Sequence, residues 1–444
     1  MHTLTHLKTT ALLIACIGLS ISNGTAQDIK PELPKIPEAV FNVQDFGLKA
    51  DGETDDSAAI QKAIDKAAEQ GGGTVRFSKG NILSGPLKMK NNIRLQIDKD
   101  VVITLLPLAR YPGGTNNPED FIGGSNLHDV AISGEGTIEG QGSDWWKIFR
   151  ETRNSKSKDT ATKEILRPRM IGLDDCTRVM IEGVTLRNSP KFHIAVRGKE
   201  LTVSKVTVRA PSSKDPVNPS HNTDACNLSG KNILVENCDI STGDDNFTCG
   251  KNTSNVLIRN NKYGTGHGLS IGSYTQGSIS NFTVRDCTFD GTENGIRIKS
   301  NRKRGGKLSG ITYENLKMTN VETPILIYTT YDDKDKKFRD LTKLTPEVAA
   351  TYPSAPLCET TPQFEDITFR NITATTIPNE RAGLAWGLPE APIGRLTLEN
   401  VTITADRPFG FYFVKEVILK NVKITTPDGE NKFVETNSKI TITK

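Results

Sequence analysis

The residues of this chain that could do chemistry together are acidic, basic and imidazole side chains at a nearly constant spacing. The stretch STGDDNFTCG places two carboxylates side by side; a third Asp precedes the second of them by 21 residues, and a His follows it by 22. The whole set is Asp224, Asp244, Asp245, His267, Arg297 and Lys299. Crowded carboxylates raise one another's pKa, so one can remain a protonated acid while others stay ionised and activate water. The residue types therefore predict acid and base catalysis.

Taken alone, the Asp244–Asp245 pair is also compatible with a solvated turn or with two calcium ligands. A solvated turn is a poor explanation of this pair, because an Asp one repeat earlier and a His one repeat later would bring charged side chains together without any benefit to the structure. His267 lies between two glycines, which leave its imidazole unshielded and favour a position in a cleft. Arg297 and Lys299 are two residues apart, so on a strand they point the same way and offer a guanidinium fork and an ammonium to a substrate carboxylate.

An internal repeat predicts the elements that position these residues. One phrase recurs: apolar, x, apolar, x, Asn or Gly, apolar, x, apolar. It reads VMIEGVTL from Val179, ITYENLKM from Ile311, ITFRNITA from Ile367, LTLENVTI from Leu396 and VILKNVKI from Val417. Period-two alternation predicts short strands with one buried face.

The polar residue in the middle of the phrase predicts a sharp bend between two strands. Asn tolerates the left-handed backbone conformation that such a bend needs. The residues concerned are Asn237, Asn260, Asn315, Asn371, Asn400 and Asn421. Each coil is therefore expected to contain a strand, a bend, a strand and a variable loop.

A unit of about twenty residues cannot bury its apolar face alone, so the coils must stack into a solenoid. We predict an all-β, single-domain right-handed parallel β-helix. Neighbouring strands in such a stack lie about 4.8 Å apart. Residues one repeat apart in sequence then become neighbours, and the chemical set lies along one face of four consecutive coils.

The open end of a β-helix needs a cover, and TDDSAAIQKAIDKAAEQGGG predicts an N-terminal capping helix. Cap candidates span Thr54 to Asp56, and Gly71 to Gly73 are the stop signal. The expected apolar stripe consists of Ala58, Ile60, Ala63, Ile64 and Ala67. The predicted division of the chain is a signal peptide over residues 1–26, an extension over 27–40 and a β-helix catalytic domain over 41–444.

The N-terminus is typical of export. Lys8 supplies positive charge, ALLIACIGLSIS is an apolar core too short to span a bilayer, and GTA ending at Ala26 is a cleavage site. LIAC ending at Cys16 resembles a lipoprotein box, but the apolar run continues past it, so we favour a secreted or periplasmic protein without a lipid anchor. No other stretch could span a membrane.

Composition adds weak constraints on partners. The net charge of +4 is slight and argues neither for nor against nucleic acid, and no basic helix with interleaved aromatics appears. We expect no nucleic-acid partner. We also expect the protein to be a monomer. After cleavage six cysteines remain, without a C-x-x-C pair that would indicate zinc. We expect most of them to be buried thiols in strands.

The motifs NTD, GDD, GHG and RIK, in that order and at these spacings, resemble the four signature motifs of glycoside hydrolase family 28, the polygalacturonase family. The resemblance also includes FGLKADGETDDSAAIQKAID, GTIEGQGSDWW and LRNSPKFHI, and covers nearly the whole chain from about Phe41. It implies that Asp244 is the general acid and that Asp224 and Asp245 hold the attacking water. It also implies that His267 supports the site.

The resemblance implies a substrate-binding set as well. Asn222 would lie at the bond that is cleaved, and Arg297 and Lys299 would hold a galacturonate carboxylate. Tyr331 in ILIYTTY is the expected tyrosine contact, with Tyr328 the less favoured candidate.

The sequence departs from the family pattern directly after the Asp pair. Many members have Cys there, whereas this chain has Asn246 and its cysteine at Cys249. The local disulfide of those members is therefore in doubt.

The implied function is inverting hydrolysis of α-linked galacturonic acid in pectic polysaccharide or oligogalacturonides, without cofactor or metal. Alternatives are a hydrolase of rhamnogalacturonan or another branched pectin, a calcium-dependent pectate lyase, or a non-catalytic polysaccharide-binding β-helix. Two long loops, DWWKIFRETRNSKSKDTATKE and residues 331–362, could wall one end of a groove. They favour exo action or a branched substrate.

Overall fold

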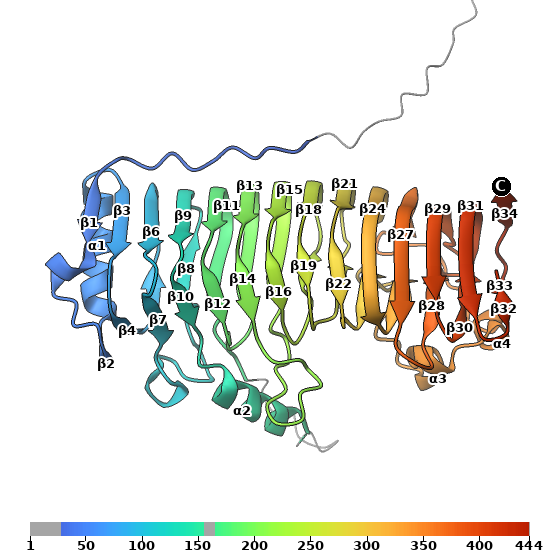
Figure 1. Cartoon of the computed structure of the whole chain (residues 1–444), viewed down its shortest axis with the longest axis horizontal. Coiled ribbons are helices and arrows are strands. Elements are labelled where there is room, and N and C mark those ends of the chain that lie inside the picture. The colour runs from blue at the N-terminus through green and yellow to red at the C-terminus, as the bar shows by residue number, and fades with distance from the viewer. Residues whose placement is uncertain (1–27, 155–164, 444) are drawn as a thin grey trace, which may run out of the picture.

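The chain winds into an elongated right-handed parallel β-helix, which confirms the fold expected from the repeat (Figure 1). The computed structural model describes residues 28–154 and 165–443. The coils follow one another along the long axis in sequence order. Each coil contacts the one before and the one after, so spacing in sequence becomes stacking in space.

The strands form three parallel stacks. The first stack consists of β5 (Leu87–Lys88), β8 (Ile122–Ser125), β11 (Ile171–Glu182), β13 (Ile194–Ser204), β15 (Cys226–Glu236), β17 (Phe247–Cys249), β20 (Leu269–Ile271), β23 (Asn294–Lys299), β25 (Thr323–Tyr328), β28 (Arg381–Trp386), β30 (Arg407–Tyr412) and β33 (Phe433–Thr436). The eight-residue phrase covers the second and third stacks only. It therefore predicted two strands in each coil and missed this one.

The second stack consists of β1 (Val40–Asn42), β3 (Gly73–Phe77), β6 (Ile93–Ile97), β9 (His128–Gly134), the later parts of β11, β13 and β15, β18 (Thr253–Arg259), β21 (Ser278–Arg285), β24 (Lys307–Val321), β27 (Ile367–Thr376), β29 (Ile393–Thr404), β31 (Val414–Thr426) and β34 (Ile440–Thr443). The third consists of β2 (Asp51–Asp55), β4 (Asn81–Ser84), β7 (Val102–Leu105), β10 (Thr137–Glu139), β12 (Thr185–Arg187), β14 (Thr207–Arg209), β16 (Asp239–Ser241), β19 (Lys262–Tyr263), β22 (Thr288–Asp290) and the later parts of β24, β27, β29 and β31. Short β26 (Gln363–Phe364) and β32 (Gly429–Glu430) pair with β24 and β31.

The predicted asparagine bends are confirmed. All six residues adopt left-handed φ angles between 49° and 56°. Their side chains also form a ladder: Asn371 donates to Asn315 at 3.0 Å, Asn400 to Asn371 at 3.0 Å and Asn421 to Asn400 at 2.9 Å. The same residue type therefore makes the corner of each coil and links it to the next.

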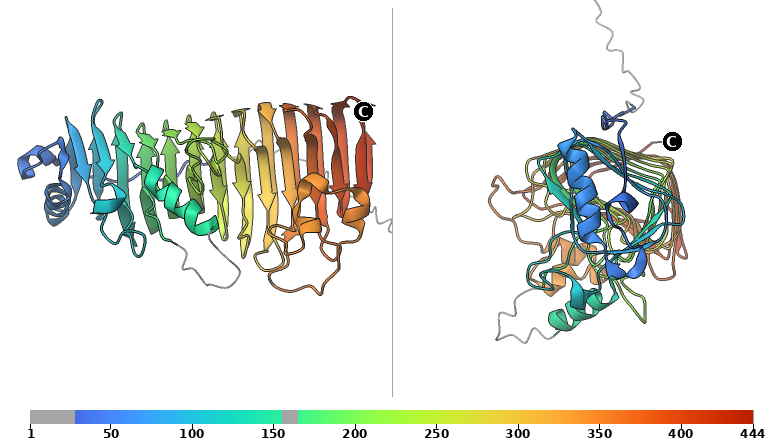
Figure 2. Two further views of the ribbon diagram at one scale, coloured as in Figure 1. Left: turned by 90° about the horizontal axis from the view of Figure 1, so that it is seen from below. Right: turned by 90° about the vertical axis from the view of Figure 1, so that its left-hand side faces the viewer.

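Helix α1 (Ser57–Glu69) covers the N-terminal end of the solenoid, as predicted (Figure 2, right). Its buried residues are Ile60, Ala63, Ile64 and Ala67. The assignment of Ala58 to this stripe was wrong: it is exposed, because two residues turn a helix by about 200°. Asp56 occupies the N-cap position, but its carboxylate accepts from the backbone N–H groups of Lys49 and Ala50 at 2.8 and 2.9 Å instead of capping the helix.

The predicted signal peptide, residues 1–26, and Cys16 lie outside the described residues. Most of the predicted extension is described and runs along the outside of the coils (Figure 1). Asp28 pairs with Arg285 at 2.6 Å and with Arg259 at 3.3 Å, and the backbone N–H of Lys35 donates to Asp129 at 2.7 Å. These contacts fix the extension across several coils.

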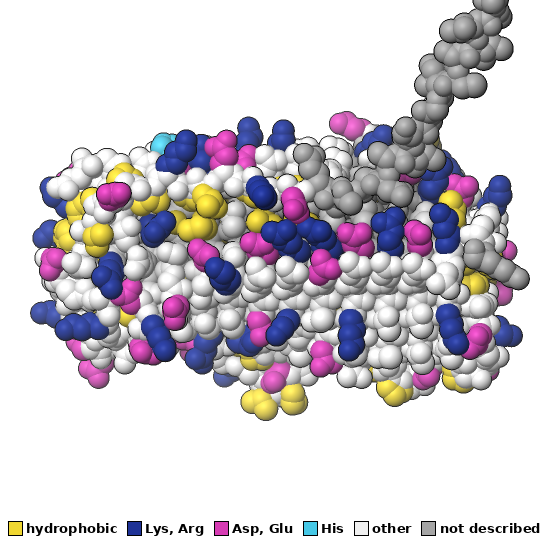
Figure 3. Space-filling model, turned by 45° about the horizontal axis from the view of Figure 1, so that its top comes forward, with side chains coloured by type: hydrophobic (Ala, Val, Ile, Leu, Met, Phe, Trp, Pro, Cys, Tyr) yellow, Lys and Arg dark blue, Asp and Glu magenta, His cyan; other side chains and the backbone are white. Residues whose placement is uncertain are grey.

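Charged side chains on the surface pair between neighbouring coils. Lys205 lies 3.1 Å from Glu182 and Arg259 lies 2.8 Å from Glu236. On the face in Figure 3, basic and acidic side chains are interspersed along the axis. Among the described residues, no helix combines the length and apolar composition needed to cross a bilayer.

Long loops flank the first stack. Helix α2 (Ser143–Asn154) belongs to one of them; η1 (Val43–Phe46) and η2 (Leu108–Arg110) are short turns near the N-terminal coils. Residues 329–362, here called the insertion, contain α3 (Lys336–Arg339), η3 (Leu341–Lys343) and α4 (Pro346–Ala350). The insertion packs beside the C-terminal coils (Figure 2, left). Its Phe338, Leu344, Ala349 and Tyr352 join a second hydrophobic core with first-stack residues.

Candidate active site

The first stack brings together the chemical residues that the sequence predicted. Strands β15, β17, β20 and β23 are consecutive parallel neighbours in this stack. Asp224, the Asp244–Asp245 pair and His267 come just before β15, β17 and β20, and Arg297 and Lys299 lie within β23. Their shared position at one edge of the stack makes a single polar cluster from residues more than 70 positions apart.

Asp245 is the centre of this cluster and is almost fully buried. Its Oδ1 accepts from Ser270 Oγ at 2.7 Å and from the Arg297 guanidinium, and its Oδ2 accepts from Lys299 Nζ at 3.1 Å. Burial raises the pKa of Asp245, but the two cations outweigh burial and hold that pKa below its usual range. Both basic residues thus serve a protein carboxylate, a contact that sequence reasoning did not anticipate.

Asp244 faces the imidazole of His267 on one side and the loop that carries Asn222 on the other. Its Oδ1 lies 3.0 Å from His267 Nδ1, and its Oδ2 accepts from the backbone and side-chain nitrogens of Asn222 at 3.1 and 3.3 Å. Burial opposes ionisation, yet His267, Arg297 and Lys299 together hold the pKa of Asp244 well below its usual value. These contacts therefore favour the ionised form of Asp244.

Asp224 has the opposite electrostatic character. Burial, followed by the charges of Asp244 and Asp245, raises the pKa of Asp224 well above its ordinary value. The expectation that crowding favours the protonated form of one carboxyl group is consistent with this, although the raised pKa is that of Asp224, whereas the resemblance assigns the acid role to Asp244.

Arg167, which sequence reasoning missed, supports the loop that carries Asn222. Its guanidinium donates to Asn222 Oδ1 at 2.9 Å and to the carbonyl of His221 at 2.8 Å, and lies 3.9 Å from the centre of the Phe149 ring. Asn222 itself has a left-handed φ of 58°. The fixed fork of Arg167 holds this strained turn against Asp244.

Tyr331 lies beside the cluster, where the sequence placed it. Lys299 Nζ is 5.4 Å from the centre of its ring. Tyr328, the less favoured candidate, is only 9% exposed and belongs to the second hydrophobic core. Tyr331 is the half-buried member of the pair and can present its ring to a ligand.

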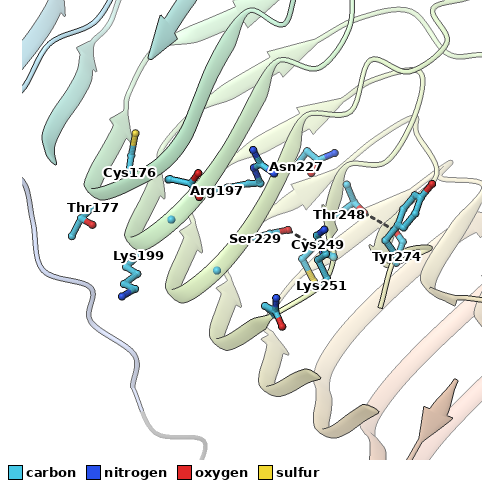
Figure 4. Close-up of a pocket in the computed structure, with 16 residues that line it drawn as sticks. Cys176, Thr177, Arg197, Lys199, Asn227, Ser229, Thr248, Cys249, Lys251 and Tyr274 are labelled. Carbon is cyan, nitrogen blue, oxygen red and sulfur yellow. Dashed lines mark hydrogen bonds between the residues drawn. The ribbon is translucent and has the colours of Figure 1, made fainter. Parts of the chain in front are cut away.

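Outward-facing residues of the first stack form the floor of a groove. Asn227, Thr248, Ser270 and Arg297 are neighbours in register on consecutive coils. Toward the N-terminal coils this floor is small and polar and opens into a cavity of about 770 Å³ (Figure 4). The lining includes Arg197, Lys199, Asn227, Thr248, Lys251 and Tyr274. Arg197, Lys199 and Lys251 are basic, Asp175 in the same lining is acidic, and Tyr274 is exposed. Basic side chains thus outnumber acidic ones, which suits an anionic sugar chain.

The floor changes character toward the C-terminal coils. Leu326 and Leu384 follow Arg297 in register, and Tyr328 and Trp386 follow Lys299. All four are buried, and they pack with the insertion. The insertion therefore covers the floor directly beyond the cluster.

Asn246, the departure from the family pattern, has a structural role. It is buried; its Oδ1 accepts from the Gly268 N–H at 2.8 Å, and its Nδ2 donates to the Thr265 carbonyl at 3.0 Å. These bonds hold the turn that carries His267. Cys249 faces the core. Neither Cys249 nor any other described cysteine forms a disulfide. Five of the six described cysteines are buried as expected, and Cys358 is exposed.

Oxygen and nitrogen atoms of Asp244, Asp245 and His267 lie within 4.8 Å of one another, close enough to surround a small cation. Arg297 and Lys299 already occupy both oxygens of Asp245, however. A divalent ion at this position would meet two fixed positive charges at short range, which is unfavourable in a buried site.

Glu293 is a further residue that sequence reasoning missed. Its Oε2 lies 3.4 Å from His267 Nε2, on the far side of the imidazole from Asp244. It stands four residues before Arg297 in TENGIRIK. An acidic residue next to the RIK motif was the available signal.

His193 gives the site a pH-dependent stability. Its Nδ1 donates to the Thr223 carbonyl at 3.1 Å and its Nε2 accepts from the Ser189 N–H at 3.3 Å, so the buried ring is neutral. Burial lowers the pKa of His193 to about 4. The unfolded chain binds this proton near pH 6.5, so the contribution is complete above that pH and is lost as the pH falls toward 4.

We therefore expect the unfolding free energy to fall by about 3 kcal/mol from pH 6.5 to pH 4 through His193 alone. Urea unfolding at a series of pH values measures this, with His193→Gln as the comparison. The variant should be less stable at pH 7 and should lack this part of the pH dependence. Equal pH dependence in both proteins would contradict the assignment.

Comparisons with known proteins extend this description. The family model of Glycosyl hydrolases family 28 matches residues 72–408, and one for rhamnogalacturonase A/epimerase, pectate lyase-like, matches residues 40–100. An endo-polygalacturonase of Pectobacterium carotovorum subsp. carotovorum is 32% identical over 431 residues, covering 89% of this chain and 94% of that protein.

Two solved structures show the same fold. A polygalacturonase from Erwinia carotovora ssp. carotovora has a TM-score of 0.69 at 29% identity, covering 87% of this chain and 98% of that one. An exopolygalacturonase from Thermotoga maritima has a TM-score of 0.72 at 22% identity, covering 92% of this chain and 94% of that one.

Proposed function

The chain belongs to glycosyl hydrolases family 28 and is a glycoside hydrolase, and from this premise we propose that it degrades pectin by cleaving α-linked galacturonic acid with inversion. The observation that carries the proposal is the cluster of three carboxylates with Arg297 and Lys299. Arg297 is followed in register, toward the N-terminal coils, by Ser270 and then by Thr248 and Asn227, which line the cavity. Arg297 and Lys299 are the two cations of the cluster, and their N–H groups suit the carboxylate of a galacturonate unit.

In the proposed mechanism Asp244 delivers a proton to the leaving glycosidic oxygen. Asp224 and Asp245 hold a water molecule on the opposite side of the sugar, and Asp245, whose contacts favour the ionised form, accepts its proton as it attacks. Inverting enzymes keep acid and base carboxyl groups roughly 6.5–9.5 Å apart so that this water fits. His267 contacts Asp244, Asn222 lies against the same carboxyl group, and Tyr331 contributes a ring to the bound sugar.

We infer that the enzyme acts at chain ends. The insertion covers the floor of the groove immediately beyond Arg297 and Lys299, whereas the polar cavity extends the groove on the N-terminal side. A polysaccharide would therefore extend over the N-terminal coils, and only a short part of it would fit between the cluster and the insertion. Such a site releases short products.

We also propose that the chain is exported, with residues 1–26 removed and residues 27–40 preceding a β-helix catalytic domain over 41–444. The support is the signal-like sequence up to Ala26 and the way the described extension lies on the finished solenoid.

Early proton NMR of polygalacturonate hydrolysis tests the mechanism and the product size together. We expect the β-anomer to appear before mutarotation, in products of one or two sugars from the first time points, with little loss of viscosity. Activity should persist in a chelator. An α-anomer appearing first would disprove inversion, and early long oligomers would disprove end action. Turnover of rhamnogalacturonan alone would move the substrate to a branched pectin.

A further inference from the structure

His267 lies between two carboxylates, and only one of them belongs to the predicted catalytic set. Its Nδ1 is 3.0 Å from Asp244 Oδ1, and its Nε2 is 3.4 Å from Glu293 Oε2. The imidazole is 19% exposed and Glu293 is 22% exposed, so the second contact is largely shielded from solvent. The arrangement is a carboxylate–imidazole–carboxylate chain that ends at the proposed acid.

Glu293 is itself held in place by another loop. Ser213 Oγ donates to Glu293 Oε1 at 3.1 Å, and Lys214 Nζ lies 3.5 Å from the same oxygen. Lys214 also pairs with Glu322. Oε1 is thus used by the loop, and Oε2 is left to face His267.

We propose that Glu293 is a positioning residue that fixes one proton on His267 Nε2 and thereby makes the Nδ1 side the place where a proton is exchanged with Asp244. This inference rests on the proposed function. A ring nitrogen that faces a carboxylate at close range keeps its hydrogen, because the negative charge favours the protonated nitrogen. Without Glu293, the single proton of a neutral ring could move to Nδ1 or stay on Nε2.

Every proton that is released in this scheme is also accepted by another group. One proton leaves His267 Nδ1 for Asp244, and a proton passes from Asp244 to the glycosidic oxygen as the bond to the sugar carbon breaks. The attacking water gives a proton to Asp245, the member of the water-holding pair whose contacts favour the ionised form, as its oxygen bonds to that carbon. His267 starts with a hydrogen on each ring nitrogen and a positive charge, and it is left neutral with its hydrogen on Nε2. Asp245 then returns its proton to solvent and His267 takes one up again. The scheme gives Asp244 a source for its proton, although the contacts of Asp244 favour its ionised form.

Every charged group that faces the imidazole enters the pH dependence. These are Asp244, Asp245 at 3.9 Å, Glu293 and the Arg297 guanidinium, whose nitrogen lies 3.3 Å from Nδ1. Arg297 opposes a proton on Nδ1, and the three carboxylates favour it. Removing the charge of Glu293 therefore removes one of the groups that favour a proton on the ring.

The test is the pH profile of kcat on polygalacturonate. We expect Glu293→Gln to lower kcat about 10-fold, leave KM nearly unchanged and move the high-pH limb to lower pH by about one unit. Glu293→Asp, which retains the charge, should keep the limb close to wild type. Lys214→Met removes the cation beside Glu293 and should move the limb the other way, which keeps the proposal testable if Glu293→Gln does not fold.

Glu322→Gln is the matched control, because it removes the other carboxylate partner of Lys214 without touching His267. It should leave the limb in place. An unmoved limb in both Glu293→Gln and Lys214→Met overturns the inference, as does an equal shift in Glu322→Gln. A wild-type protein that fails to cleave any pectic substrate would refute the proposed function instead.

Discussion

Replacing Asp244 with Asn should lower kcat on oligogalacturonides by about 10²–10⁴-fold with the fold intact. The amide keeps the shape of the carboxyl group and can still accept from the backbone N–H of Asn222, a bond of 3.1 Å in the native site. It cannot carry a proton to the leaving oxygen. Steady-state rates measure the loss, and circular dichroism with a thermal melt checks folding. A variant with more than a tenth of wild-type activity would contradict the acid role.

Because burial and the neighbouring charges raise the pKa of Asp224 while His267, Arg297 and Lys299 lower that of Asp244, the same experiment must separate the two carboxyl groups. A galacturonosyl fluoride provides the comparison, since fluoride leaves without protonation. Asp244→Asn should regain most of its rate on this substrate. Asp224→Asn should stay impaired, because activation of water is still needed. The reverse pattern would assign the acid role to Asp224.

The fold could be predicted because short, local sequence patterns determine its strands and corners. Alternating apolar residues specify a strand wherever they occur, and residues such as Asn315 and Asn371 specify a corner by their own backbone preference. Ala58 shows the limit of composition: it is apolar and lies in the helix, but its angular position points it to solvent.

The candidate site could be predicted only as far as the coil length stays regular. Asp224, Asp245 and His267 are one coil apart, so their stacking follows from counting residues. The partner of Asn222 does not, because Arg167 lies 55 residues earlier, beyond a long loop. The contact between Glu293 and Lys214 spans 79 positions, and no spacing rule relates a coil to a variable loop.

The ion pairs of Asp245 show a different limit. The sequence places Arg297 and Lys299 as two cations on the same side of a strand, and it predicts a substrate carboxylate as their partner. Side chains of such length reach across a coil, and a buried cation needs an anion even in the empty site. The carboxylate of Asp245 supplies that anion.

This dependence leads to a second large effect, on stability and activity together. The side chains of Asp245, Arg297 and Lys299 are only 5%, 11% and 8% exposed. Asp245→Asn leaves the two cations without the carboxylate that both of them contact directly. We expect the unfolding free energy to fall by about 3–5 kcal/mol and hydrolysis to be nearly abolished, because a water-holding carboxylate is also lost. Urea unfolding and initial rates on polygalacturonate measure the two effects.

A second substitution separates these effects. Adding Lys299→Met to Asp245→Asn removes one of the two unpaired cations, so the double variant should regain part of the lost stability while remaining inactive. Lys299→Met alone should weaken cleavage of methyl-esterified as well as free galacturonate, because it disturbs Asp245 and not only the contact with the substrate carboxylate. A simple sum of the two single stability losses in the double variant would show that Asp245 and Lys299 do not depend on each other. A loss confined to the free acid would show that Lys299 serves the substrate and that the Arg297 guanidinium suffices for Asp245.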